Sequence, residues 1–456
     1  MYRLIPSRTN RLLLVLSDLE MAAGGPLDDL PSTALVESIL DGYDDLDDLP
    51  VDLVLNGDIF DFLKTSVEGV YPHHITQDIA LQKLDRIVTA HGSFFDTLRE
   101  FIDVSPTRRR IVFLVGNHDQ EMCFPEVQEG IRKAVGRKQL LFPGFSWKMG
   151  RVWIEHGQQK DSMFAVDPEK PFLVKDDDII LNLPWGSVAV LEAILPLQRW
   201  LHHFDRLKPR ERIFELFPEL KDTLVQVFWK YWTQDYWKGF WSSEDPLKKI
   251  TWQMFREITY RFGSTDPNVS VRDRYMKKLI FHEEIDLLII GHEHTSHWFS
   301  KSHKKLLQTG CFRDEYLLSG TRGSVRQRLL PKTYAEVWMQ DEEVLSSSLV
   351  ELNECRESEV PLEDTLAEVL PLIHEHIGQP ETRRLLQLGR EEEEKQDDNS
   401  EKSHDADKTE EEIDKHHITE TNEDSRTDSE ENTDSEENTD SFQDSDSKQP
   451  ASEENE

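Results

Sequence analysis

Five short clusters in the sequence combine carboxylate, amide and imidazole side chains, the groups that bind metal ions and transfer protons. They are Ser17-Asp18-Leu19-Glu20, Asn56-Gly57-Asp58-Ile59-Phe60-Asp61, Gly116-Asn117-His118-Asp119, Glu155-His156-Gly157 and Gly291-His292-Glu293-His294. Each is weak alone, because an Asp after a strand is often only a helix cap and a lone His is more often a satisfied polar residue than a ligand. The last cluster is stronger, since its two imidazoles at one strand end can face a common site.

Six side chains from these clusters form a mixed set of oxygen and nitrogen ligands: Asp18, Asp58, Asn117, His156, His292 and His294. If they converge, they could hold two divalent cations about 3.5–4 Å apart, the arrangement that clamps the attacking and leaving oxygens of a phosphate. The glycines beside Asp58, Asn117 and His292 would let the backbone turn sharply, so that the ligands point inward. The sequence shows no Ser or Cys in a recognisable nucleophile elbow, so we expect no covalent intermediate.

Each cluster follows an apolar run that is typical of a buried strand. The expected strands are Leu12–Leu16, Val51–Leu55, Ile111–Val115, Val152–Ile154 and Ile285–Ile290. Between the second and third strands, apolar residues recur at helical spacing: Leu84, Ile87, Val88, Phe95, Leu98 and Ile102. Strands that alternate with helices indicate an α/β layered domain, and such sheets bind ligands at the carboxyl ends of their strands. All five clusters are expected at that end.

The alternation stops between residues 158 and 280, a stretch that holds seven of the eleven tryptophans. Helical patterns near Ile194 and Ile213 predict an inserted, largely helical cap. Its tryptophans could fill the cap's own core, or some could line an apolar slot for a lipid-like or aromatic group. We expect a core in two parts (1–157 and 281–355), the cap at 158–280, C-terminal helices at 356–390 and a tail at 391–456. Strands that complete the second layer of the core are expected at Lys305–Gln308, Thr333–Trp338 and Ser347–Leu352.

The tail is very acidic, with 28 Asp or Glu against 6 Lys or Arg, a net charge of −22 within a chain of −36. It repeats Thr-Asp-Ser-Glu-Glu-Asn and cannot bury enough apolar surface to offset the entropy of ordering, so we predict that it is disordered. Such charge argues against stable nucleic-acid binding. No apolar run reaches the roughly 18–20 residues of a membrane span, and three cysteines without metal-ligand spacing favour a reduced, cytoplasmic location. Protein partners of the tail are left open.

The clusters resemble the motifs of the calcineurin-like metallophosphoesterases, which run Asp-x-His, Gly-Asp-x-x-Asp, Gly-Asn-His-Asp/Glu, His and Gly-His-x-His. The resemblance covers roughly residues 10–157 and 285–352, and four of the five motifs are intact. It implies a four-layer sandwich of two packed mixed sheets flanked by helices. The segment Gly-Asp-Ile-Phe-Asp and the cap are also similar to enzymes that cleave UDP-diacylglucosamine, but those have an Arg at the position of His118, and that substrate is not assigned.

The resemblance also implies roles for the motif residues. Asp18 and His294 would bind the first metal, Asn117, His156 and His292 the second, and Asp58 would bridge the two. His118 is the candidate that stabilises the phosphate or protonates the leaving oxygen, so His118, Asp58 and Asn117 are the predicted catalytic residues. Asp61 and Asp119 would support these groups from behind.

The sequence departs from the family pattern in two places. Gln158 follows Gly157 where many relatives have a His, at a position that is not normally a ligand. Glu20 replaces the His of the first motif. A carboxylate there can still reach a cation, so we expect Glu20 to be a metal ligand; the alternative is a Glu turned to solvent beside an empty first position. The added hard oxygen favours two manganese ions, with Fe, Zn or Mg as further candidates.

The resemblance implies a phosphoesterase that hydrolyses a phosphomonoester, phosphodiester or pyrophosphate by attack of a metal-bound hydroxide. The substrate would be a phosphorylated small molecule or a lipid-linked phosphate. The alternative is a catalytically degenerate scaffold that keeps the fold and binds partners, and only Glu20 favours it. His73 and His74 form a solvated loop pair or approach the substrate, and His297 and His303 are rim or surface residues.

Overall fold

The computed structural model describes residues 5–30, 32–230, 245–247, 269–353 and 356–378. The predicted acidic tail lies outside these residues, and so do Trp232, Trp237, Trp241 and Trp252 of the insertion. The described residues belong to one compact unit, Met1–Gln379. None of their helices combines the length and the apolar character that crossing a bilayer requires.

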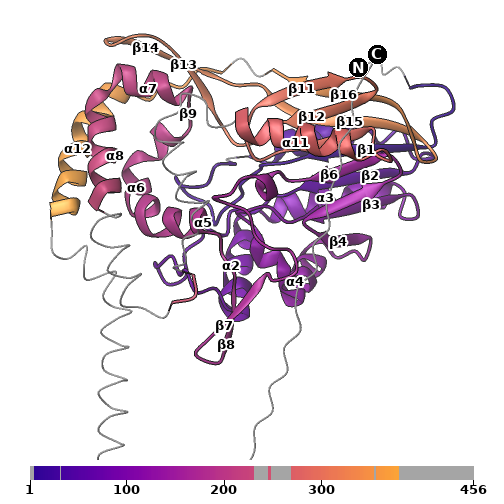
Figure 1. Cartoon of the computed structure of the whole chain (residues 1–456), viewed down its shortest axis with the longest axis horizontal. Coiled ribbons are helices and arrows are strands. Elements are labelled where there is room, and N and C mark those ends of the chain that lie inside the picture. Colours follow the sequence, from indigo (N-terminus) through magenta and orange to yellow (C-terminus); the bar gives the residue numbers. More distant parts are fainter. Residues whose placement is uncertain (1–4, 31, 231–244, 248–268, 354–355, 379–456) are drawn as a thin grey trace, which may run out of the picture. The chain divides into compact units, whose positions relative to one another are not determined.

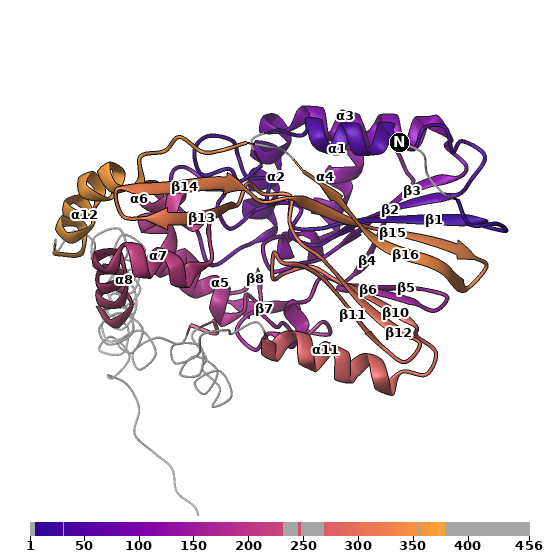
Figure 2. The ribbon, with the colours of Figure 1, turned by 90° about the horizontal axis from the view of Figure 1, so that it is seen from above.

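Two mixed sheets form the centre of this unit (Figures 1 and 2). The first has the strand order β16 (Glu343–Leu352), β15 (Lys332–Gln340), β1 (Arg11–Leu16), β2 (Val51–Asn56), β3 (Arg109–Leu114) and β4 (Leu140–Gly144). The second has the order β11 (Ser296–Lys301), β12 (Lys304–Thr309), β10 (Leu287–Ile290), β6 (Val152–Glu155) and β5 (Ser146–Met149). Strands β1 to β4 are parallel neighbours, and so are β6, β10 and β12. All five predicted strands are therefore present.

Helices cover the outer faces of both sheets, which gives four layers (Figure 2). The first sheet packs against α1 (Ala34–Asp41), α2 (Gln77–Ala90), α3 (Gly92–Val104) and α4 (Pro125–Val135). The second sheet packs against α11 (Val269–Phe281), through Tyr275 and Leu279. The predicted α/β class, two packed mixed sheets flanked by helices, is confirmed.

The apolar runs of the strands have a simple physical reason. Leu12, Leu14 and Leu16 of β1 face the helices, while Leu13 and Val15 face the second sheet. All five are fully buried. A strand covered on both faces needs an uninterrupted apolar sequence, and this is why the runs stand out in the chain.

Two of the late strands join a different sheet from the one expected. Lys304–Thr309 does pair in the second sheet, beside β10. The strand predicted at Thr333–Trp338 lies in β15, which pairs antiparallel with β1, and β16 follows it at the edge of the first sheet. The prediction that these two strands complete the second layer was wrong. Their apolar pattern indicates burial, but it does not encode which neighbour they pair with.

A smaller core forms beside the sandwich. It contains α6 (Leu195–Asp205), α7 (Arg210–Leu216), α8 (Pro218–Lys230) and α12 (Leu362–Gly378), together with the hairpin β13 (Tyr316–Thr321) and β14 (Ser324–Leu329). Strand β13 also pairs with β9 (Leu207–Lys208). The small core therefore combines a segment that precedes α11 in the sequence with one that follows it. Before it lie the hairpin β7 (Phe172–Lys175) and β8 (Asp178–Leu181), α5 (Trp185–Ala189) and the π-helix η3 (Val190–Ile194). Trp185 is buried, and Trp200 is partly buried against the small core.

Candidate metal centre

The five predicted clusters begin at the carboxyl ends of β1, β2, β3, β6 and β10. Backbone hydrogen bonds join the first two. The amide of Asp18 donates to the carbonyl oxygen of Gly57 (3.2 Å), and that of Glu20 donates to the carbonyl oxygen of Asp58 (2.9 Å). The two acidic loops therefore run side by side as an extension of the sheet.

Several predicted ligands have a strained backbone. Their φ angles are positive: 55° at Asp18, 52° at Glu20, 51° at Asp58, 73° at His292 and 54° at His294. The left-handed region costs a non-glycine residue roughly 1–2 kcal/mol. Strain of this kind persists where the surrounding structure enforces it, and it is concentrated at functional sites. Its coincidence with the predicted ligands supports a site at these strand ends.

The neighbouring glycines serve two different purposes. Gly57 has a φ of 75°, and a Cβ there would come within 2.6 Å of His156 Cγ. Gly116 and Gly291 have no such φ, so the expectation of a sharp turn was wrong for these two. They are needed because a Cβ would lie 2.1 Å from Asp58 Oδ1 and 2.5 Å from Asp18 Oδ2, respectively.

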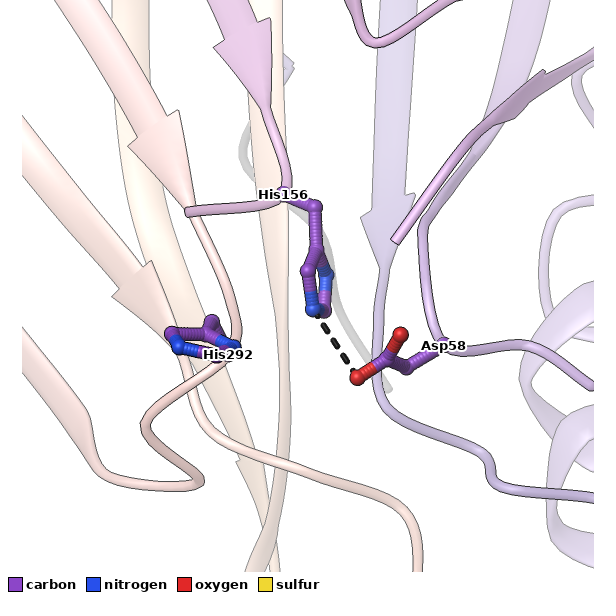
Figure 3. Close-up of side chains that lie close together, drawn as sticks. All are labelled: Asp58, His156 and His292. Carbon is purple, nitrogen blue, oxygen red and sulfur yellow. Dashed lines mark ion pairs between the residues drawn. The ribbon is translucent and has the colours of Figure 1, made fainter. Parts of the chain in front are cut away.

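One group of potential ligands consists of Asp58, His156 and His292 (Figure 3). One ligand atom from each lies within 4.8 Å of the others. Asp58 Oδ2 and His156 Nε2 are 3.0 Å apart, and both side chains are almost fully buried. Asn117 lies next to this group, between Gly116 and His118, and the His118 amide donates to Asp58 Oδ1 (2.8 Å).

A second group contains Asp18, Glu20 and His294. His294 Nε2 lies 3.3 Å from Asp18 Oδ1 and 3.0 Å from Glu20 Oε1. Asp18 also connects the two groups, because its Oδ1 is 3.9 Å from His156 Nε2 and both its oxygens accept from the His292 amide at 3.2 Å. The structure therefore brings together the residues that the sequence proposes as ligands.

Each of the three imidazoles has one nitrogen beside a protein acceptor. His156 Nδ1 donates to the carbonyl oxygen of Asn56 (2.8 Å). His292 Nε2 lies 3.2 Å from Asp161 Oδ2, and His294 Nδ1 lies 2.9 Å from Glu315 Oε1. Metal-binding histidines are oriented in this way, because the partner fixes the tautomer and leaves the other nitrogen free to bind the ion.

Asn117 Oδ1 is buried and has no hydrogen-bond partner among the described residues. His156 Nε2 and Glu20 Oε1 are also buried, and each meets only another proposed ligand, Asp58 Oδ2 and His294 Nε2 respectively, at 3.0 Å. Buried polar atoms without a partner are rare and call for an explanation such as a bound ion. Since the three are an amide oxygen, an imidazole nitrogen and a carboxylate oxygen, the donor set fits divalent cations of the Mn, Fe or Zn kind.

Without cations, protons balance the charge of the site. Burial alone would lower the pKa of His156, but the carboxylates of Asp58 and Asp18 raise it to about 9. Burial opposes the charge of Asp58 too, yet His156 and His118 hold its pKa well below the usual range. The pKa of His294 is raised despite burial, chiefly by Glu20. Bound cations would take the place of these protons.

Glu20 points into the protein and is 1% exposed, so a Glu turned to solvent is not what the structure shows. Its two oxygens have different surroundings. Oε2 accepts from Arg313 Nη1 (2.8 Å) and lies 3.4 Å from Lys64 Nζ, while Oε1 faces His294. Burial would raise the pKa of Glu20, but Arg313 and Lys64 lower it well below the ordinary value. Glu20 therefore stays a carboxylate with one oxygen available.

Behind Glu20 lies a buried network of charges. Arg313 Nη2 donates to Asp205 Oδ2 (2.9 Å), and its Nη1 is 3.5 Å from Asp29 Oδ2. Lys64 also pairs with Asp29, which is further held by Arg206 (2.9 Å). The network joins the first cluster to the end of α6, and so to the inserted segment.

His118 is placed differently from the ligands. Its Nδ1 lies 3.2 Å from Asp61 Oδ1, and its side chain is 18% exposed. Burial would lower the pKa of His118, but Asp61 and Asp58 raise it to about 10. Asp119 accepts from the amides of Gly116 (2.6 Å) and Ile59 (2.9 Å), so it fixes the loop that carries Asn117 and His118.

Sequence reasoning missed four residues that border the site: Lys64, Asp161, Arg313 and Glu315. None belongs to a motif. The only signal in the sequence is weak: Arg313-Asp314-Glu315 follows the apolar pair Cys311-Phe312, and all five residues are buried. Of the other candidates, His303 is 67% exposed on its side chain and His297 is exposed on β11, as expected for surface residues.

No family model and no curated protein matches the chain. Solved structures do match it. The chain is similar to an archaeal phosphodiesterase, with 10% identity over 75% of this chain and 99% of that one and a TM-score of 0.25. It is similar to a putative 5′-nucleotidase from Staphylococcus aureus (12% identity, 79% and 58% covered, TM-score 0.31). It is also similar to vacuolar protein sorting 29 from Cryptosporidium parvum (10% identity, 76% and 100% covered, TM-score 0.24).

Proposed function

We propose that this chain is a metal-dependent hydrolase of phosphate esters or pyrophosphates. The observation that carries the proposal is the arrangement of the three histidines. His156, His292 and His294 each have one nitrogen beside a protein acceptor and come together with the carboxylates of Asp18 and Asp58. A structural histidine cluster would have no need of strained backbone at five of its members or of the buried Asn117 oxygen without a partner.

The residues divide into two ligand sets that share one carboxylate. Asp58, Asn117, His156 and His292 would hold one divalent cation, and Asp18, Glu20, Asp58 and His294 the other. Two such cations would supply positive charge to the phosphoryl oxygens and activate a water for attack. Mn²⁺ suits this oxygen-rich set, in which three carboxylates accompany three imidazoles.

His118 would supply the proton for the leaving oxygen. It lies at the edge of the ligand sets, partly open to solvent, with Nδ1 beside Asp61 and Nε2 left for the substrate. In the metal-free chain burial lowers the pKa of His118, but Asp61 and Asp58 raise it to about 10, and Asp61 would remain beside it when cations bind Asp58. A positioned acid of this kind typically contributes about 10²–10⁴-fold in rate.

Turnover of bis(p-nitrophenyl) phosphate and p-nitrophenyl phosphate by the full chain tests the proposal, with and without added Mn²⁺. We expect hydrolysis that requires the metal. Asp58→Asn removes the shared charge with little change in shape, and it should abolish both metal binding and turnover. His118→Asn should retain the metal and lose about 10²–10⁴-fold in kcat.

His303→Gln is the matched control, because His303 is an exposed imidazole that belongs to neither ligand set. It should leave turnover unchanged. A chain that folds and binds no metal would instead be a scaffold. Undiminished hydrolysis by Asp58→Asn would contradict the proposed centre directly.

A further inference from the structure

A second group of metal-binding side chains lies outside the candidate centre. His73 and His74 occupy the loop between β2 and α2, just before Thr76 caps that helix. Their rings lie side by side, with centroids 4.2 Å apart. Both side chains are about one-third exposed, at 33% and 28%. The two imidazoles are therefore in contact with each other and partly open to solvent.

The third member comes from the inserted segment. Asp245 has a largely buried side chain, 8% exposed. Its Oδ1 accepts from the amide of Leu247 (3.0 Å), which turns Oδ2 toward the histidines. That oxygen is 3.0 Å from His74 Nε2 and 3.8 Å from His73 Nε2. Two nitrogens and one oxygen from distant parts of the chain thus lie within 4.8 Å of one another.

The chemistry of this group suits a transition metal. Burial would raise the pKa of Asp245, but hydrogen bonds from His74 and the Leu247 amide lower it to about 2, so it is ionised at neutral pH. Two imidazoles and one carboxylate form a common protein ligand set for Zn²⁺, and three ligands leave the fourth tetrahedral position for water. Harder ions such as Mg²⁺ and Ca²⁺ prefer oxygen ligands.

We propose that His73, His74 and Asp245 form a separate zinc-binding site that ties the inserted segment to the core. The ion would join the loop after β2 to the inserted segment, since His74 and Asp245 are 171 positions apart in the sequence. That loop begins at Asp61 and Lys64, which border the candidate centre. The ion therefore holds one end of this loop, at His73 and His74. At the other end of the loop, Lys64 contacts Glu20 and Asp61 contacts His118.

Zinc counting on the full chain tests this site, with free Zn²⁺ set by a chelator. Four chains are compared: wild type, His74→Gln, Asp245→Asn and His303→Gln. The two site variants should each bind one ion fewer than wild type, or bind it at least about tenfold more weakly. His303→Gln is a matched control, because His303 also faces an aspartate, Asp286 at 3.6 Å, without a second imidazole. It should bind as wild type does.

The same comparison in an Asp58→Asn background separates this site from the candidate centre. Asp245→Asn should still remove one ion there. Zn²⁺ should also raise the Tm of the Asp58→Asn chain and lose this effect when Asp245→Asn is added, since only a ligand that binds the folded state stabilises it. Far-UV circular dichroism of the zinc-free variants checks that they fold.

Equal zinc stoichiometry and affinity in all four chains would overturn the proposal and leave His73, His74 and Asp245 as a plain ion pair. Loss of more than one ion in Asp245→Asn would also overturn it, because the site would then not be separate.

Discussion

Among single residues, Glu20 distinguishes this chain from the motif pattern that it resembles. A carboxylate in place of an imidazole adds a negative charge to a site already rich in them. The structure balances that charge from behind, through Arg313 and Lys64, which contact Oε2. Oε1 is left facing His294. Glu20 is therefore placed to bind a metal ion through Oε1, while Arg313 and Lys64 balance the charge of its other oxygen.

Arg313→Met tests this balance. It removes one of the two buried cations that Glu20, Asp29 and Asp205 share and leaves Lys64 alone beside them. This should lower the free energy of unfolding of the metal-free chain by about 3–5 kcal/mol. Mn²⁺ should recover part of the loss, because a cation at Oε1 offsets the uncompensated carboxylate. Chemical denaturation with and without Mn²⁺ measures both effects.

Arg151→Met is the control for Arg313→Met. Arg151 pairs with Asp286 at the surface, where both side chains are about one-quarter exposed. Its replacement should cost no more than about 1 kcal/mol, and Mn²⁺ should leave this difference from wild type unchanged. Equal losses in the two variants would contradict the role assigned to Arg313.

The raised pKa of His156 predicts how metal binding depends on pH. Its imidazole holds a proton below pH about 9 in the metal-free chain, against an ordinary value of 6.5. A cation must displace that proton, so the apparent Mn²⁺ affinity should rise with pH up to about 9, by about tenfold per unit for each proton displaced. Calorimetry in buffers of different ionisation enthalpy measures the proton release.

The stability of the metal-free chain should follow the opposite trend. A histidine with a raised folded pKa stabilises the fold fully below its unfolded pKa, and this stabilisation disappears as the pH rises through the folded value. The contribution of the His156–Asp58 pair is thus lost between pH 6.5 and about 9. For the metal affinity predicted above, an Mn²⁺ affinity that does not change between pH 6.5 and about 9 would show that His156 holds no proton to displace.

At the scale of elements, the site depends on how closely the loops after β2 and β3 approach each other. Gly116 allows this approach, because a Cβ there would collide with the carboxylate and amide of Asp58 at 2.1 and 2.5 Å. Gly116→Ala should therefore displace Asp58 and reduce metal affinity severely, while the sheets remain folded. Gly92→Ala is the control, since a Cβ at Gly92 meets nothing within 4 Å at the start of α3. Metal titration with circular dichroism distinguishes the two, and normal metal affinity in Gly116→Ala would refute the close-approach argument.

Much of the architecture could be predicted from the sequence, because β1, β2, β3, β6 and β10 are covered on both faces and are apolar apart from their ends and Asp52 of β2. The polar clusters stand out at their ends for the same reason. The sheet membership of β15 could not be predicted, since pairing is decided by the partner strand. The roles of Arg313 and Glu315 could not be predicted either, because an isolated charged residue shows its importance only when its burial and its partners are known.

At the scale of the whole molecule, charge matters most. The chain carries −36, of which −22 lies in residues 391–456, so residues 1–390 carry −14. An acidic protein attracts divalent cations and repels anionic substrates such as phosphates. The cations at the candidate centre would therefore be needed both to bind the substrate and to activate water, and the chain without them should have little affinity for phosphate esters.

Anomalous diffraction from a crystal of the full chain grown with Mn²⁺ tests the two-ion centre most directly. The account predicts two peaks about 3.5–4 Å apart, with Asp58 between them. One should lie among Asn117, His156 and His292, and the other among Asp18, Glu20 and His294. No peak at these strand ends, or a single peak that Asp58 does not touch, would contradict it.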